Sequence, residues 1–175
     1  MTGRPDGSLP TGRELRRVLG SFATGVTVLT VGGMHPHGMT VNSFTSVSLD
    51  PPLVLVCVGR STVTHTLLED ASGFGLSVLA AGHAGIARFF ADPRRPVGPG
   101  EFAGIPTVPG ARSGVPLIAD ALAWFECEPW RHYDGGDHTI VVGRLRTAVR
   151  RATTGALLFH DGVLGTTDHE RRTRA

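Results

Sequence analysis

The chain has 175 residues, of which 41% are hydrophobic and 18% are charged, and its formal net charge is +2. These values predict one folded domain and exclude a chain that stays disordered. The arginines gather near the C-terminus without interleaved aromatic residues, which disfavours nucleic acid as a partner. The longest apolar run covers residues 53–58, whereas a membrane helix needs about 20 residues, so we expect no membrane span.

The cysteines and the composition of the termini predict the cellular compartment of the protein and the bounds of its domain. Cys57 and Cys127 each stand in an apolar stretch, and the N-terminus lacks the apolar run of a secretory signal. We therefore expect reduced thiols and a cytoplasmic location. Residues 1–10 and 166–175 are mostly polar, so we expect mobile ends around one domain over residues 11–165.

The first element has the pattern of an amphipathic helix. Thr11 and Glu14 have the spacing of a capping box. The apolar positions that follow recur every three to four residues, at Leu15, Val18, Leu19 and Phe22. This pattern predicts a helix of about three turns with one apolar face.

The rest of the chain reads as mainly β with short helices. Two helices are expected, one capped by Ser61 and one over residues 83–91, and the proline-rich residues 92–114 are expected to form a loop. Because most strands are neighbours in sequence, we predict a six-stranded antiparallel split β-barrel. Strands are expected over residues 26–31, 38–48, 53–58, 74–79, 122–130 and 138–146, with a hairpin around Asp161-Gly162. The run 53–58 is apolar on both faces, as in a central strand.

The predicted strand over residues 38–48 is unusually rich in Gly, Thr, Asn and Ser. Strict alternation would place Thr40, Asn42, Phe44 and Ser46 on one face. An aromatic residue among hydrogen-bonding side chains suits a planar heterocycle with polar edges. A solvated strand face is the alternative interpretation.

Residues 60–64 lie where a buried strand is expected to end and a helix to begin. Hydroxyls and backbone N–H groups at such a junction bind phosphate. The alternative is that Ser61 serves only as an N-cap.

A titratable pair, Asp137 and His138, follows the turn at Gly135-Gly136. His138 precedes an apolar strand, so a neutral imidazole there can donate to a bound amide or a developing charge. The alternative is an ordinary hairpin turn with a solvated Asp137. The sequence supports a metal site less than either of these interpretations. Pro36 interrupts the His-x-His of His35 and His37, and no second spaced pair completes a set of ligands. We expect no metal.

Three motifs occur in order between about Leu15 and Gly165: FATGVTVLT at residues 22–30, GMTVNSFTSVSLDPPLV at 38–54, and GGDH at 135–138. With them the sequence resembles the short-chain flavin reductase family, the reductase components of two-component flavin monooxygenases such as 4-hydroxyphenylacetate 3-monooxygenase. The resemblance implies an FMN-binding split barrel. It also implies a homodimer with flavin near the subunit interface.

The resemblance also assigns site residues. Those that match flavin contacts of the family are His37, Gly38, Met39, Thr40, Asn42, Ser43, Cys57, Val58, Ser61, Thr62, Arg88 and Phe89. Asp137 and His138 match the family's nicotinamide-facing motif. The sequence departs from the family at Asn42, where relatives often carry Ser or Gln, and in the loop over residues 94–100.

Together these features predict an NAD(P)H:flavin oxidoreductase. NADH or NADPH would transfer a hydride to FMN or FAD, and the protein would supply orientation rather than a nucleophile. The reduced flavin would then pass to a partner monooxygenase. Two alternatives stay open: an oxidase of the same fold that retains FMN, and a non-enzymatic barrel that stores or senses flavin.

Overall fold

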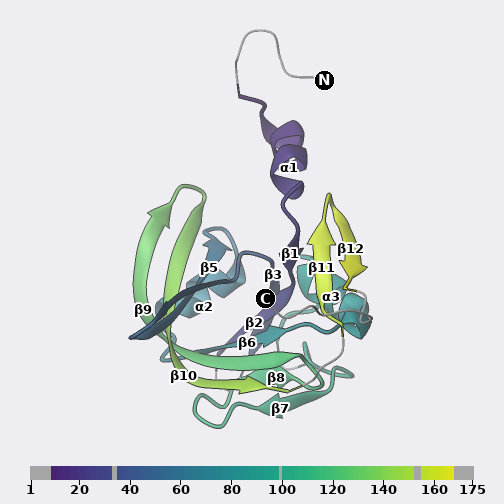
Figure 1. Cartoon of the computed structure of the whole chain (residues 1–175). Coiled ribbons are helices and arrows are strands. Elements are labelled where there is room, and N and C mark those ends of the chain that lie inside the picture. Colours follow the sequence, from purple (N-terminus) through teal and green to yellow (C-terminus); the bar gives the residue numbers. More distant parts are fainter. Residues whose placement is uncertain (1–8, 33–34, 99, 152–154, 168–175) are drawn as a thin grey trace.

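The computed structural model describes residues 9–32, 35–98, 100–151 and 155–167 (Figure 1). Its main sheet has seven antiparallel strands in the order β3-β2-β6-β9-β10-β5-β4. The strands are β2 (Thr27–Val31), β3 (His37–Val41), β4 (Thr45–Leu49), β5 (Pro52–Gly59), β6 (Phe74–Val78), β9 (Ala123–Gly135) and β10 (His138–Arg150). Most of the expected mobile ends, residues 1–8 and 168–175, lies outside the described residues.

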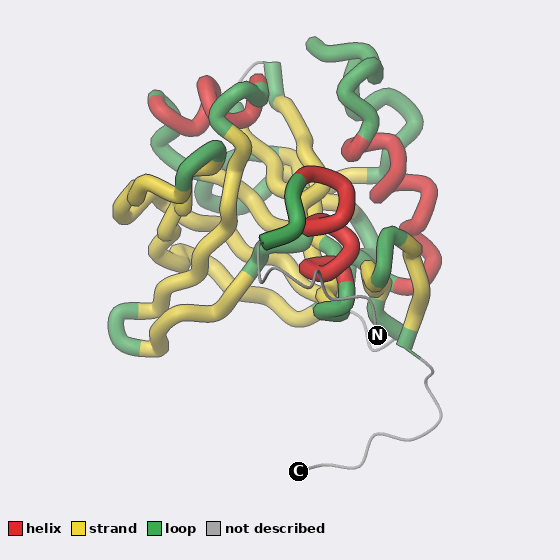
Figure 2. Tube along the Cα trace, turned by 90° about the horizontal axis from the view of Figure 1, so that it is seen from above, coloured by secondary structure: helices red, strands yellow, loops and turns green. Residues whose placement is uncertain are grey.

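Two small sheets and a few short helices complete the fold. Strand β11 pairs with both β1 and β12 in one small sheet, and β7 pairs with β8 in the other. Helices α2 and α3 lie on opposite sides of the strands in both views (Figures 1 and 2). The further bounds are β1 (Thr24–Gly25), β7 (Thr107–Pro109), β8 (Pro116–Ile118), β11 (Leu157–His160), β12 (Val163–Thr166), α1 (Gly12–Gly20), α2 (Val63–Glu69), the 3₁₀ turn η1 (Ala81–His83) and α3 (Ala84–Ala91).

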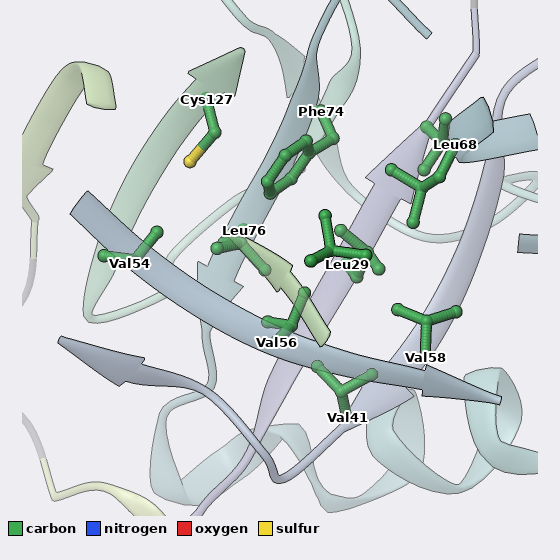
Figure 3. Packing of buried hydrophobic residues seen from close by; sticks show 11 residues of the cluster. Leu29, Val41, Val54, Val56, Val58, Leu68, Phe74, Leu76 and Cys127 are labelled. Carbon is green, nitrogen blue, oxygen red and sulfur yellow. The ribbon is translucent and has the colours of Figure 1, made fainter. Parts of the chain in front are cut away.

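The core consists of two apolar clusters that share strand β2. Leu29 belongs to a cluster with Val56 and Phe74 inside the main sheet, where α2 contributes Leu68 (Figure 3). The neighbouring Val28 belongs to the other cluster, which packs around α3 and the small sheet. Successive side chains of a strand point to opposite faces, so β2 fixes both clusters relative to each other.

Much of the predicted secondary structure is confirmed. The described sheets are antiparallel throughout, and the two long strands pair as the hairpin β9–β10. Strands β11 and β12 form the predicted hairpin, with positive φ at both Asp161 (48°) and Gly162 (80°). Two positive φ values in a two-residue loop match the right-handed twist of the flanking strands.

The predicted six-stranded barrel differs from the observed sheet in strand number. The sheet has seven strands because residues 38–48 form two strands, β3 and β4, rather than one. These two strands occupy the two edges of the sheet, and no ladder joins them within the described ranges. The expected common face of Thr40, Asn42, Phe44 and Ser46 is therefore absent: Phe44 packs against the core, whereas Ser46 is exposed.

The prediction for residues 53–58 was half right. Strand β5 forms, but it lies next to the edge strand β4 and buries alternate residues, Val54, Val56 and Val58. The side chains between them are only half-buried, so the outer face of β5 stays accessible in the single chain.

Helix starts and the long loop need three corrections. The Thr11 side chain makes no capping hydrogen bond, although α1 forms. The N-cap of α2 is Thr62 rather than Ser61, because the Thr62 hydroxyl accepts from the His65 N–H. The proline-rich residues 92–114 include strand β7 and are not loop throughout. No described helix is long and apolar enough to cross a membrane.

Candidate functional site

A cavity of about 440 Å³ opens between the end of β3, helix α3 and the β11–β12 hairpin. Its size lies within the range typical of small-molecule and cofactor sites. Mainly apolar side chains line it, with a few polar ones. The lining residues are Val26, Thr40, Asn42, Ala87, Arg88, Ala91, Phe159, Gly162, Val163 and Leu164.

Three of the predicted flavin contacts, Thr40, Asn42 and Arg88, meet in this cavity. The Thr40 hydroxyl donates to the Ala87 carbonyl at 2.8 Å and so ties β3 to α3. Asn42 follows β3 directly, and Arg88 comes from the next position of the helix after Ala87. A mostly apolar wall with an amide and a guanidinium suits a planar ring with polar edges.

A second group of predicted residues meets at Gly59, the last residue of β5. His138 lies directly opposite Gly59 in the β5–β10 ladder. A methyl group at Gly59 would lie 3.4 Å from the Thr62 Cγ2 and 3.7 Å from the His138 Nε2. The structure thus brings the predicted phosphate-binding turn next to the predicted nicotinamide-facing histidine.

His138 and Asp137 form a hydrogen-bonded pair at the tip of the β9–β10 hairpin. The His138 Nδ1 lies 2.7 Å from the Asp137 Oδ1, and the His138 side chain is 47% exposed. The hydrogen bond from His138, followed by its charge, lowers the pKa of Asp137 below the ordinary value. A carboxylate only accepts, so Nδ1 carries the proton and a neutral His138 presents an Nε2 lone pair.

Arg60 holds this turn in place. Its backbone N–H donates to the Asp137 carbonyl at 3.0 Å, and its Nε donates to the His138 carbonyl at 3.4 Å. Its guanidinium also donates to the Asp134 carboxylate at 2.8 Å. Arg60 lies in the segment predicted to bind phosphate, but no pattern in the sequence indicates that it places His138.

The hydroxyls of the predicted phosphate turn differ in their environment. Thr62 donates to the Gly59 carbonyl at 2.8 Å and accepts from the His65 N–H at 3.2 Å, so its hydroxyl is already engaged. Ser61 is exposed. The assignment of both residues to a phosphate stays a prediction.

Ser43 and Cys57, also predicted contacts, bind each other. The Ser43 hydroxyl donates to the Cys57 carbonyl at 3.2 Å and accepts from its N–H at 2.9 Å. This pair continues the contact with β5 before the first residue of β4, Thr45, which lies opposite Leu55. Ser43 thereby fixes the segment that carries Asn42.

The remaining predicted contacts turn inward. Val58 is fully buried, Met39 packs against the first core cluster and Phe89 against the second. The His37 imidazole is 4% exposed and lies against Glu101. Gly38 faces Phe90, whose ring carbon would lie 2.5 Å from an added Cβ. The flavin contacts assigned to these residues stay predictions.

Several functional candidates carry no signal in the sequence. The β11–β12 hairpin supplies Gly162, Val163 and Leu164 to the cavity, although only its turn was predictable. Glu101 lies in the proline-rich segment and is 1% exposed. Over the described part of the chain, no cluster of three or more His, Cys, Asp or Glu side chains could hold a metal ion.

The fold and the site define a β-sheet protein with a mainly apolar cavity beside α3 and, at the tip of the β9–β10 hairpin, a half-exposed histidine. The sequence model of the flavin reductase like domain matches residues 19–168. The chain therefore belongs to the flavin reductase family.

Similar proteins support this assignment. An NADH-dependent FAD reductase of Streptomyces globisporus is 54% identical over 149 residues, which cover 85% of this chain and 82% of that protein. An NADH-dependent FMN reductase of Agrobacterium fabrum is 40% identical over 154 residues, 87% of this chain and 84% of that protein.

Solved structures agree with the sequence relatives. The flavin reductase component of a bacterial two-component tryptophan halogenase has a TM-score of 0.85 at 53% identity, covering 88% of this chain and 96% of that one. The NADH:FAD oxidoreductase of Streptomyces globisporus, in complex with NAD and FAD fragments, has a TM-score of 0.85 at 48% identity. The match covers 91% of this chain and 94% of that one.

Proposed function

We propose that this chain uses NADH to reduce FAD or FMN and releases the reduced flavin to a partner oxygenase. The observation that carries the proposal is the cavity in which Thr40, Asn42 and Arg88 meet, in a chain that belongs to the flavin reductase family. The names of the relatives support NADH as the hydride donor and both FAD and FMN as acceptors.

The cavity residues bind and orient the flavin in this proposal. When bound, flavin supplies the hydride acceptor, so the protein needs no nucleophile of its own. The apolar wall made by Ala87, Ala91 and Phe159 excludes water from the ring. Asn42 and Arg88 offer hydrogen-bond donors to its polar edge or to its phosphate.

His138 binds the nicotinamide in this proposal. Its Nε2 lone pair accepts from the carboxamide N–H, while Asp137 holds the imidazole from behind. The exposed turn at Ser61 and Thr62 binds the flavin phosphate in this proposal and lies on the same side, because both Thr62 and His138 flank Gly59. The predicted flavin contacts at Ser43 and Cys57 act through the backbone that they fix.

The split barrel and the homodimer are finer parts of the proposal. The main sheet exposes Val47, Leu49 and Tyr133, and α1 exposes Val18 and Leu19. Large apolar side chains on a monomer surface mark an interaction site. A second copy of the chain would cover them beside Cys57 and His138. Light scattering at micromolar concentration tests this, and a monomer mass would contradict it.

The partner and the location follow the relatives and the composition. The flavin-dependent trigonelline monooxygenase of Acinetobacter baylyi has a reductase component that is 38% identical to this chain. The match covers 42% of the length of that component. We propose a flavin-dependent oxygenase as the recipient here and the cytoplasm as the site of action. Both cysteines are free thiols, in keeping with a reducing compartment.

The test is aerobic oxidation of NADH or NADPH by the purified chain with added FAD or FMN and no organic substrate. We expect continuous NADH consumption that scales with the concentration of free flavin. Turnover that needs no added flavin would favour an oxidase that retains FMN. Flavin binding without NADH consumption would favour storage or sensing and overturn the reductase.

A further inference from the structure

A buried ionic cluster lies next to the cavity without lining it. The Glu101 carboxylate, 1% exposed, accepts from the His37 Nδ1 at 2.7 Å, from the Gly38 N–H at 3.1 Å and from the Arg95 Nε at 3.1 Å. Arg95 also donates to the Gly38 carbonyl and to the His37 Nε2, the latter at 3.2 Å. We call Glu101, His37 and Arg95 the Glu101 clamp.

The hydrogen bonds of the clamp fix the protonation of His37. A guanidinium only donates, so the His37 Nε2 must present its lone pair to Arg95. The proton then sits on Nδ1 and is donated to Glu101. The clamp thus combines one buried anion, one buried cation and a neutral imidazole, an arrangement in which each charge has its partner.

The clamp joins two of the three elements that form the cavity wall. His37 and Gly38 begin β3, which carries Thr40 toward the cavity. Arg95 and Glu101 follow α3, which supplies Arg88. Two ties therefore connect β3 with α3 and its following segment: the Thr40 hydroxyl on Ala87, and the clamp at the start of the strand.

The packing around Gly38 leaves little space between β3 and α3. An added Cβ at Gly38 would lie 2.5 Å from a Phe90 ring carbon and 3.2 Å from the Phe102 ring. The Arg95 guanidinium lies 5.8 Å from the centre of the Phe90 ring. Close-packed interiors shift between discrete arrangements rather than stretch, so a broken clamp should displace α3 against β3.

We propose that Glu101 is a positioning residue for flavin: the Glu101 clamp sets the separation of β3 and α3 and thereby the shape of the cavity. This inference rests on the proposed function, since it takes the cavity as the flavin site. Glu101 touches no ligand in this account and acts through Gly38 and His37.

Glu101→Gln tests the proposal at the level of single atoms. The amide oxygen can still accept from Gly38 or Arg95, but the amide nitrogen would donate toward the His37 Nδ1, where a proton already sits. We expect the dissociation constant and the KM of FAD to rise about tenfold. The NADH KM and the kcat at saturating FAD should change by less than about twofold, because His138 is not displaced.

Glu126→Gln is the matched control, since it removes a buried carboxylate elsewhere. Glu126 is 3% exposed and accepts from Arg112, Ser113 and Thr147, and none of these residues lines the cavity. Its FAD affinity, measured by fluorescence quenching, should equal that of the wild type. Equal losses in both variants, or wild-type FAD affinity in a folded Glu101→Gln, would overturn the positioning role.

A second measurement uses the wild-type chain and needs no variant to fold. Hydrogen exchange of the peptides that contain Gly38 and Glu101 should slow on addition of FAD, whereas the peptide around Ser113 should exchange as before. No change at Gly38 under saturating FAD would contradict the proposal. If FAD does not bind the wild type at all, the proposed function fails first.

Discussion

The Glu101 clamp and the hairpin tip at His138 are both built from a carboxylate, a histidine and an arginine, but in opposite environments. The clamp side chains are at most 8% exposed, whereas those of Asp137 and Asp134 at the tip are 93% and 83% exposed. Buried charges are costly to separate, while exposed ion pairs contribute little and adapt. In the proposed function both ligands enter and leave in every cycle, but the buried set keeps the shape of the flavin cavity fixed, whereas the exposed set adapts to the nicotinamide.

Removal of the buried cation should give the largest effect. Arg95→Met leaves the Glu101 carboxylate buried without its counter-ion, so the free energy of unfolding should fall by about 3–5 kcal/mol. Arg94→Met is the control, because Arg94 is exposed and, among the residues that the structure describes, its ion pair is with Asp92. Urea unfolding of both variants checks this, and similar midpoints for the two would refute the contrast.

The next effect concerns the buried carboxylate of Glu126 and its pH dependence. Burial raises the pKa of Glu126, but hydrogen bonds from Ser113, Arg112 and Thr147 outweigh it and hold the pKa below its ordinary value. Glu126→Gln should therefore lower the free energy of unfolding at neutral pH by about 1.5–3 kcal/mol.

The pH dependence of that difference has a definite sign. A lowered pKa in the folded state means that the ionised Glu126 stabilises the fold above the ordinary carboxyl pKa. The advantage of the wild type over Glu126→Gln should shrink as the pH falls through the lowered pKa. Urea unfolding from neutral to acid pH measures it, and a difference that grows in acid would contradict the assignment.

His138→Ala should separate the two regions kinetically. Loss of the Nε2 acceptor should raise the NADH KM about tenfold, since the proposed hydrogen bond to the nicotinamide is removed. The FAD dissociation constant should stay at the wild-type value, because His138 does not line the cavity. Steady-state kinetics with flavin titration decides this, and loss of FAD with an unchanged NADH KM would reverse the ligand assignment.

Arg60→Met should have the smallest effect. The Arg60 side chain contacts the His138 carbonyl and the exposed Asp134 carboxylate, whereas the backbone N–H that donates to the Asp137 carbonyl remains in the variant. Loss of the side chain should therefore loosen the turn without unfolding it. We expect the NADH KM to rise about two- to fivefold, in keeping with exposed ion pairs. A rise as large as that of His138→Ala would mean that Arg60 itself binds the nucleotide.

The sequence predicted the strands well, since their signals are local. Residues 26–31 are marked by a β-branched run and the turn at Asp161-Gly162 by glycine, and the structure confirms both. The break between β3 and β4 was missed because its cause is not local. The Ser43 hydroxyl makes the hydrogen bonds to the Cys57 backbone that a neighbouring strand would otherwise make. Nothing in the alternation of residues 38–48 indicates this side-chain contact.

The candidate site was predictable only where motif and geometry coincide. Thr40, Asn42 and Arg88 were named from the family resemblance and meet in one cavity. The Glu101 clamp joins positions 64 residues apart in the chain, and no spacing rule connects His37 with Glu101. A buried carboxylate in a proline-rich segment reads as a solvated loop residue until the fold is known.

Anaerobic reduction of flavin tests the central claim most directly. The purified protein is mixed under argon with NADH and with FAD in large molar excess over the protein. The absorbance of oxidised flavin is followed until it stops changing. A flavin reductase that releases its product should reduce many flavins per chain, with one NADH consumed per flavin. Reduction that stops after one flavin per chain, or that does not occur with FAD or FMN, would contradict the account.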